Sequence, residues 1–417
     1  MKKRALIIFF YISSIISIDN PHFYKASQFF YRPRLTEPGL FSIVGYSNWG
    51  GGDDGYNEER ELVPLLSIWG CQNMQFIAKG VPQSILNKNP NSILNDLYEK
   101  DAECPFGQLC FSGKFRILSW DFDLQKNFCD GFFLHIHLPV RKLRIYNIKF
   151  QDLSTYENSG QVDFQQWRNF TFNFDEDINK YGLCFSRSVS NSGPGDLTFN
   201  LGKTINYEET TKIDFVDATL EAGILLPTGR STDPSEPFDL PTGYNKHLGF
   251  PVAFSLSIGI FEWFTTGTYF NILLFKSNTQ CIRMKTDLCQ NGPIKLASGT
   301  ANVKRGPLFT YGFYLEADHV TRGFTFLFGY QLNNQSKTEV TPFDNPTFDP
   351  FIVNSDSMLQ GWQMSTINFL VEYDFADLEH PNRPKLGVTL DLTAKGKQIF
   401  RTKVGGFFFG ADISCNF

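Results

Sequence analysis

Apolar and polar residues alternate at every second position in many segments between residue 107 and the carboxyl end of the chain. In residues 324–330, for example, Phe324, Phe326 and Phe328 alternate with Thr325 and Leu327. A period of two places successive side chains on opposite faces of a β-strand. We expect strands near 107–124, 130–140, 142–152, 195–206, 212–226, 248–262, 263–276, 307–320, 321–335, 358–376, 384–395 and 401–417.

The links between these strands alternate in length. Long polar stretches lie at 153–194, 227–247, 277–306 and 336–357. Short links lie near 125–129, 139–142, 205–211, 262–263, 319–321, 376–384 and 396–400. Short turns at one end and long loops at the other are typical of transmembrane barrels. The pattern predicts an all-β fold, with residues 107–417 forming a transmembrane antiparallel β-barrel of about 12 strands.

One expected strand departs from strict alternation. Within 142–152 the apolar face changes parity between Ile145 and Ile148. An extra residue in one strand of a pair shifts all following side chains to the other face. We therefore predict a β-bulge between these two residues.

The amino-terminal part of the chain divides into two. Residues 1–17 combine a basic start, Lys2 to Arg4, with an apolar run too short to span a bilayer, which indicates a signal peptide and a secreted protein. Residues 18–106 form an amino-terminal extension. Its segments 41–46 and 62–69 flank a glycine-rich loop, so the extension is either an additional hairpin, raising the strand count to 14, or a plug that folds inward.

Composition supports a membrane barrel. The chain contains 44 Phe, 16 Tyr and 6 Trp but only 19% charged residues. Aromatic girdles and a lipid-facing surface account for such a content, whereas a soluble core rarely needs it. After the signal segment no apolar run of 18 residues follows, which excludes a helical membrane protein. Without residues 1–17 the chain carries 35 basic and 43 acidic residues, which argues against nucleic acid as a partner.

The carboxyl-terminal strand carries a family resemblance. Phe407, Phe409, Ala411, Ile413, Cys415 and Phe417 share one face, and the chain ends in Phe417. This strand resembles the terminal strand of bacterial outer-membrane β-barrels of the porin or transporter type, and the turn Pro227-Thr228-Gly229 is similar to turns in such barrels. The resemblance implies that Phe417 is the signal read by the barrel-assembly machinery. It also implies contact with outer-membrane lipid, extracellular long loops and periplasmic termini.

We expect neither an enzyme nor a bound metal or cofactor. His135 and His137 share one face of a strand, and without a third ligand they are expected to be polar residues that line the lumen. The acidic glycine loop at 52–59 matches no calcium motif and is expected to be a solvated turn. Eight cysteines fit an oxidising compartment, and we predict a disulfide between Cys281 and Cys289, which would close a loop of about nine residues.

Carboxylates recur on the strand faces opposite the lipid-facing residues. A carboxylate facing lipid would be destabilising, so these side chains are expected to line the lumen and to favour passage of cations. They are Asp121, Asp123, Asp217, Glu221, Glu316, Asp318, Glu372, Asp374, Asp391 and Asp412, and Lys149 is a basic residue that could share their face. The leading functional hypothesis is a channel for passive passage of small hydrophilic or amphipathic solutes. The alternative is a structural or surface-interaction barrel with a closed lumen and functional outer loops.

Overall fold

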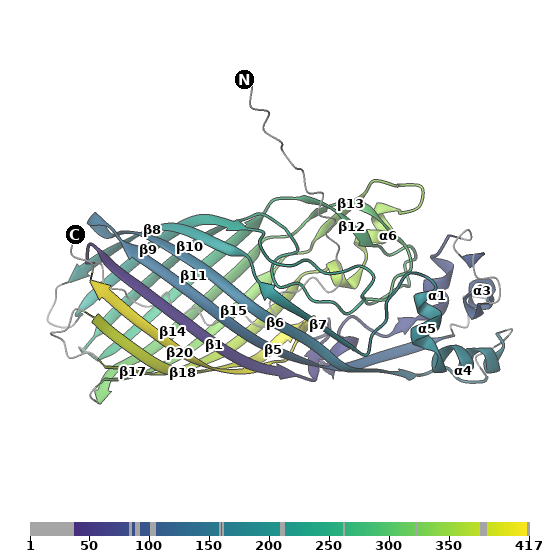
Figure 1. Ribbon diagram of the computed structural model, residues 1–417, viewed down its shortest axis with the longest axis horizontal. Helices are drawn as coiled ribbons and strands as arrows, with labels where there is room; N and C mark the ends of the chain where they lie inside the picture. The colour runs from purple at the N-terminus through teal and green to yellow at the C-terminus, as the bar shows by residue number, and fades with distance from the viewer. Residues whose placement is uncertain are drawn as a thin grey trace, which may run out of the picture.

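The computed structural model describes residues 37–82, 86–87, 92–100, 106–157, 160, 162–208, 213–261, 263–321, 323–375 and 382–414. Twelve antiparallel strands pair in chain order into a closed barrel (Figure 1). The ring closes where β1 (Leu40–Gly52) pairs with β20 (Lys403–Ser414) on one side and with β5 (Gln108–Asn127) on the other. The remaining barrel strands are β6 (Phe132–Asp152), β8 (Leu197–Glu208), β9 (Phe215–Leu226), β10 (Gly249–Ile260), β11 (Phe264–Phe275), β14 (Leu308–Thr321), β15 (Phe324–Gln335), β17 (Trp362–Asp374) and β18 (Asn382–Lys397).

Connections differ in length between the two ends of the barrel, as the sequence pattern predicts. At one end, called here the turn end, strands join through the short connections 128–131, 209–214, 261–263, 322–323 and 375–381. At the opposite loop end they join through 53–107, 153–196, 227–248, 276–307, 336–361 and the short link 398–402. The helices of the chain gather at this loop end (Figure 1). None of the helices in the described residues is long and apolar enough to cross a bilayer.

Two of the predicted strand boundaries are wrong, although the strand count is confirmed. The predicted strands 130–140 and 142–152 are one strand, β6, which runs straight through the expected turn at 139–142. The twelfth strand is β1, from the segment assigned to the amino-terminal extension, so the barrel begins at Leu40 rather than near residue 107. Residues 139–142 stay extended because they pair with β5 along their whole length.

The predicted bulge is present. Asn147 adopts a left-handed backbone conformation with φ of 56°, and the register between β5 and β6 shifts by one residue at this point. Ile145 and Ile148 are both fully buried as a result. β7 (Ser188–Pro194) extends the same side of β6 beyond the end of β8, with a break at Gly195 and Asp196.

Side chains alternate between the two faces of the barrel wall. The outer face carries exposed aromatic and aliphatic residues around the ring, as a lipid-facing surface requires. Examples are Trp120, Leu220, Phe254, Phe270, Phe313, Phe326, Phe369, Leu390 and Phe409. Phe407 and Phe409 of the last strand lie on this face, as predicted, whereas Cys415 and Phe417 lie outside the described residues, as do residues 1–17.

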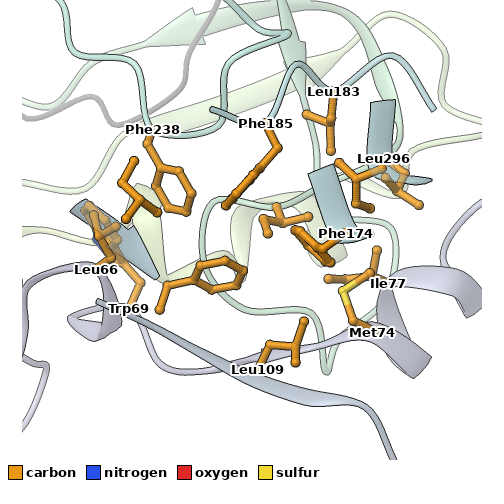
Figure 2. Packing of buried hydrophobic residues seen from close by; sticks show 14 of the residues in the cluster. Leu66, Trp69, Met74, Ile77, Leu109, Phe174, Leu183, Phe185, Phe238 and Leu296 are labelled. Atoms are coloured by element: carbon orange, nitrogen blue, oxygen red, sulfur yellow. The ribbon is translucent and has the colours of Figure 1, made fainter. Parts of the chain in front are cut away.

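The loop end is covered by a hydrophobic cap with its own packed core (Figure 2). Residues within 65–81, 93–97, 164–189, 238–240 and 294–296 contribute to it together with Leu86, and they pack on the lumen face of β5 and β6. Four of its Phe rings, those of Phe111, Phe174, Phe185 and Phe238, form a chain of contacts with centroids 5.1 to 6.0 Å apart. The cap helices are α1 (Met74–Lys79), α3 (Ile93–Glu99), α4 (Phe164–Phe172) and α5 (Phe174–Asn179).

Two small sheets and a helix complete the loop end. β2 (Asp54–Tyr56) pairs with β3 (Leu62–Pro64) and with β19 (Ile399–Phe400). β12 (Asn278–Arg283), β13 (Ser298–Lys304) and β16 (Glu339–Pro342) form the second sheet beside α6 (Pro350–Asn354). The predicted extension is therefore neither a barrel hairpin nor a separate plug, because after β1 it joins the other loops in the cap.

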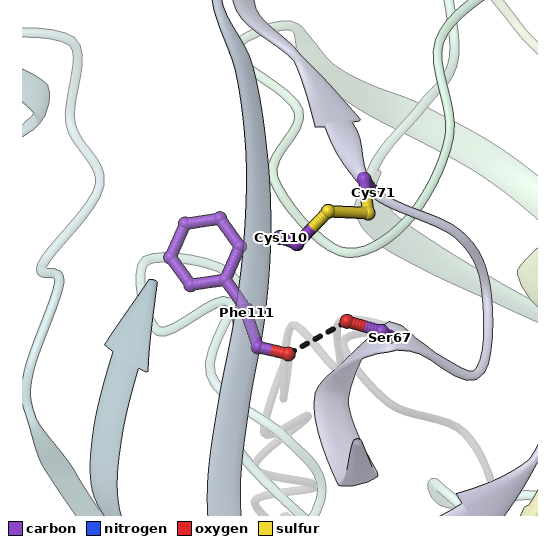
Figure 3. The surroundings of a disulfide bond; sticks show 4 residues. All are labelled: Ser67, Cys71, Cys110 and Phe111. Carbon is purple, nitrogen blue, oxygen red and sulfur yellow. Dashed lines mark hydrogen bonds between the residues drawn. A yellow bond between two sulfur atoms is a disulfide. The ribbon is translucent and has the colours of Figure 1, made fainter. Parts of the chain in front are cut away.

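One disulfide fixes the cap to the barrel wall (Figure 3). Cys110 near the start of β5 is bonded to Cys71, which precedes β4 (Gln72–Asn73). The Ser67 hydroxyl donates to the carbonyl of Phe111 at 2.7 Å beside this bond. The predicted Cys281–Cys289 bridge is wrong, since both are free thiols here. Cys281 lies within β12, and Cys289 lies in an exposed turn held by the Asp287 carboxylate.

Candidate functional site in the barrel lumen

All ten predicted carboxylates occupy lumen-facing positions of their strands. Asp121 and Asp123, Glu221 and Asp391 lie deep along β5, β9 and β18, where each is at most 6% exposed. The other six lie close to the turn end of their strands, and three of them are half-buried rather than buried. This placement follows from the period of two. Each carboxylate directly follows or precedes a lipid-facing residue, so its own side chain points to the opposite face of the strand.

Lumen-facing basic residues are fewer in the described part of the chain. Lys385 of β18 lies 3.4 Å from Asp412 of β20. Arg141 of β6 donates to the carbonyl of Thr242 at 3.5 Å. Lys149 does not belong to this set, because it follows the bulge and faces outward, exposed and paired with Ser112.

His135 and His137 line the lumen, as predicted, and each contacts a carboxylate. The two nitrogens of His135 lie 3.0 Å from Asp123 and 3.3 Å from Glu221. His137 lies 3.0 Å from the same oxygen of Asp123. Strands β5, β6 and β9 are therefore joined across the lumen wall by one polar ladder. Among the described residues no group of three or more His, Cys, Asp or Glu could hold a metal ion.

A second polar set lies where the ring closes. The Ser119 hydroxyl donates to Asp121 at 2.7 Å, and the Asn48 amide of β1 donates to the same oxygen at 3.3 Å. The Thr389 hydroxyl of β18 donates to Asn48 at 3.5 Å. Buried polar groups of β5, β1 and β18 are thus linked by hydrogen bonds, so the wall of the lumen is polar at this level.

Aromatic side chains also face the lumen, but they lie against its wall. Tyr314 stands directly opposite Gly267, and Tyr269 directly opposite Gly312, in the pairing of β11 with β14. A Cβ atom built on Gly312 would fall 2.2 Å from the Tyr269 ring, and one on Gly267 would fall 2.5 Å from the Tyr314 ring. The two hydroxyl groups bond along the wall, Tyr314 with Ser257 at 2.6 Å and Tyr269 with Gln331 at 3.0 Å. Each tyrosine ring thus occupies the space that a side chain at the facing glycine would fill.

The lumen changes character at the loop end. There many inward-facing side chains of the barrel are apolar, although Asn333 and Gln335 of β15 are buried polar residues at the same end. On β5 and β6 the apolar side chains join the cap core, and on the opposite side a second cluster covers the rim: Tyr56, Leu225, Leu273, Leu308, Trp362, Met364 and Ile399. The lumen wall is therefore acidic and polar toward the turn end and more apolar below the cap.

Sequence reasoning missed two parts of this arrangement. The alternation gave no signal that Tyr269 and Tyr314 pair with glycines, since cross-strand register is needed to see it. The cap residues lie in segments without regular periodicity, such as 164–185, which the pattern assigned only as a long loop.

Comparison with known proteins yields distant structural likenesses. No protein-family model and no curated protein matches the chain. An outer membrane channel from Pseudomonas putida F1 is 10% identical, with alignment over 91% of this chain and 97% of that one and a TM-score of 0.48. The toluene transporter of Ralstonia pickettii is 8% identical over 91% and 90% of the two chains, with a TM-score of 0.31. The barrel architecture itself rests on the strand pairing described above.

Proposed function

We propose that this chain is a passive channel of the bacterial outer membrane that prefers cations among small hydrophilic or amphipathic solutes. The observation that carries the proposal is the excess of carboxylates over basic side chains on the lumen face of the described strands. In a low-dielectric wall such charges attract cations and repel anions. The long loops would be extracellular and both ends of the chain periplasmic.

The wall-bound tyrosines support an open lumen. Facing glycines leave room for the two rings beside the wall, as a passage for solute and water would require. No cofactor and no catalytic residue enters this mechanism, since passage depends on size and on the electrostatic potential of the lumen.

The test is the reversal potential of the purified barrel in a planar bilayer under a potassium chloride gradient. We expect a cation preference that weakens at high salt, because the Debye length falls to about 3 Å at 1 M. The double variant Asp121→Asn with Glu221→Gln should reduce the preference. A matched control is Lys304→Gln with Glu339→Gln, which removes an exposed ion pair between β13 and β16 at the loop end. Anion preference in the wild type, or an unchanged preference in the lumen variant, would overturn the proposal.

The cap favours a second candidate function. Its packed aromatic core and the apolar rim opposite it could close the lumen, leaving the outer loops to act as an interaction surface. Single-channel recording distinguishes the two functions. Stable ohmic steps support the channel, and their complete absence supports the closed barrel.

A further inference from the structure

A row of basic side chains crosses the outer face of the wall at the loop end. In the strand pairing, Lys403 of β20 stands opposite Gly51 of β1, Gly51 opposite Arg116 of β5, and Arg116 opposite Arg144 of β6. Lys114 and Lys142 lie on the same face, next to this row. All of these basic side chains are exposed, and none is part of an ion pair recorded for the described residues.

The facing arginines are unusual in a sheet. Like charges directly opposite one another on neighbouring strands are destabilising. Here Arg116 and Arg144 are held close to each other by Tyr146, whose ring centre lies 5.6 and 5.3 Å from the two guanidinium carbons. Arg144 also donates to the Ser188 hydroxyl at 3.1 Å. Both guanidinium groups thus lie near the same ring, and an anion that contacts both would offset their repulsion.

Gly51 leaves a hollow in the middle of the row. A groove of about 590 Å³ opens there, lined by glycines 50–52, Trp49, Arg116, Lys114 and Tyr146. Asp53 is the one carboxylate among its lining residues, and it is exposed at the edge. The lining of the groove therefore combines basic side chains with the apolar Trp49 and Leu118.

The position of the row along the barrel indicates what binds there. Directly toward the turn end on the same outer face come Trp49, Leu118 and Trp120, and the two tryptophans are 46% and 41% exposed. Tryptophans on a lipid-facing surface mark the boundary between hydrocarbon and headgroups. The basic row thus lies at headgroup level, where Lys and Arg attract anionic lipid.

We propose that the groove between β1, β5 and β6 binds the phosphate groups of a phosphorylated lipid in the outer leaflet. Arg116 and Arg144 contact the phosphate, Lys114 and Lys403 flank it, and the acyl chains continue down the wall past Trp49. This assignment rests on the proposed membrane orientation of the barrel, but not on conductance through its lumen.

The test is native mass spectrometry of the full barrel in detergent with lipid A, dephosphorylated lipid A or phosphatidylcholine as probe. The wild type should retain lipid A only. Arg116→Gln with Arg144→Gln should weaken retention about tenfold or more, given roughly 1 kcal/mol per basic residue near a membrane surface. The control Lys304→Gln with Lys337→Gln removes two exposed charges from the outer loops and should retain lipid A as the wild type does.

Folding of each variant is checked by heat-modifiable gel mobility. The variant Arg116→Lys with Arg144→Lys keeps the charge and should retain lipid A at an intermediate level. Equal retention by the Gln variant and its control would overturn the proposal. So would equal retention of the dephosphorylated lipid, or displacement of lipid A by millimolar inorganic phosphate, which would indicate a site for soluble anions. Conductance of the Gln variant is recorded in parallel. Lost lipid retention with intact conductance supports the lipid site, whereas absent conductance in all proteins contradicts only the channel.

Discussion

Tyr269 and Gly312 face each other across β11 and β14, and the small residue decides where the large one lies. With any side chain at position 312, the Tyr269 ring would have to move from its present position. We therefore expect the width of the proposed passage to depend on a residue that has no side chain.

Gly312→Val tests this dependence. We expect lower single-channel conductance and a loss of stability of about 1–3 kcal/mol from overpacking. The control is Gly45→Val on the outer face, where the added side chain meets the Phe409 ring, which can swing into lipid. Equal conductance of Gly312→Val and the wild type would show that the ring does not restrict passage.

The polar ladder gives a second test at this scale. Asp123 accepts from two imidazoles at 3.0 Å, so Asp123→Ala leaves buried polar groups without their partner. We expect a loss of about 1–3 kcal/mol in the free energy of unfolding, measured by urea titration of the barrel in lipid vesicles. Asp123→Asn keeps an acceptor oxygen and should lose less. A neutral effect of Asp123→Ala would indicate that water replaces the carboxylate.

Among the strands, β6 contains one feature that the sequence predicted correctly and one that it predicted wrongly. The parity change between Ile145 and Ile148 correctly located a bulge, because the alternation of apolar and polar residues along a strand shows which side chains are buried. The turn expected at 139–142 was wrong, because Pro139 and two basic residues look like a turn whereas pairing with β5 keeps them extended. Register and partner strand are long-range properties, and local pattern does not encode them.

Asn147 allows a direct test of the bulge. Its φ of 56° is accessible to Asn and Gly but strained for β-branched residues. Asn147→Val should therefore destabilise the barrel by about 1–3 kcal/mol, and Asn147→Gly should be close to neutral. The comparison is made from urea unfolding midpoints. Equal midpoints of the two variants would mean that the bulge moves or disappears at no cost.

For the whole molecule, the cap is the part that sequence reasoning left unassigned. The lumen carboxylates followed from alternation along single strands, but the cap core joins residues from parts of the chain that are far apart in the sequence. Phe238 and Phe174, for example, meet only because their loops leave the barrel at the same end. The paired cysteines were likewise not foreseen, since Cys71 and Cys110 lie on different elements.

Cys71→Ser should loosen the cap and leave the barrel intact. The bond spans 39 residues, and its loss should cost about 2–4 kcal/mol locally. We expect faster limited proteolysis within 72–106, unchanged heat-modifiable mobility and, if the cap restricts the mouth, larger conductance steps. Cys129→Ser, a free and exposed thiol at the turn end, is the control and should change none of these. Equal proteolysis of both variants would show that packing alone holds the cap.

The pairing of β1 with β20 affects the biosynthesis of the protein. Residues 40–52 are made early in translation, yet one edge of β1 stays open until residues 403–414 have been synthesised and delivered. Until then the open edge of β1 presents unpaired backbone N–H and C=O groups, which promote aggregation. Such late, long-range pairing is also slow. A chain that stops short of β20 is therefore expected to be degraded rather than inserted into a membrane.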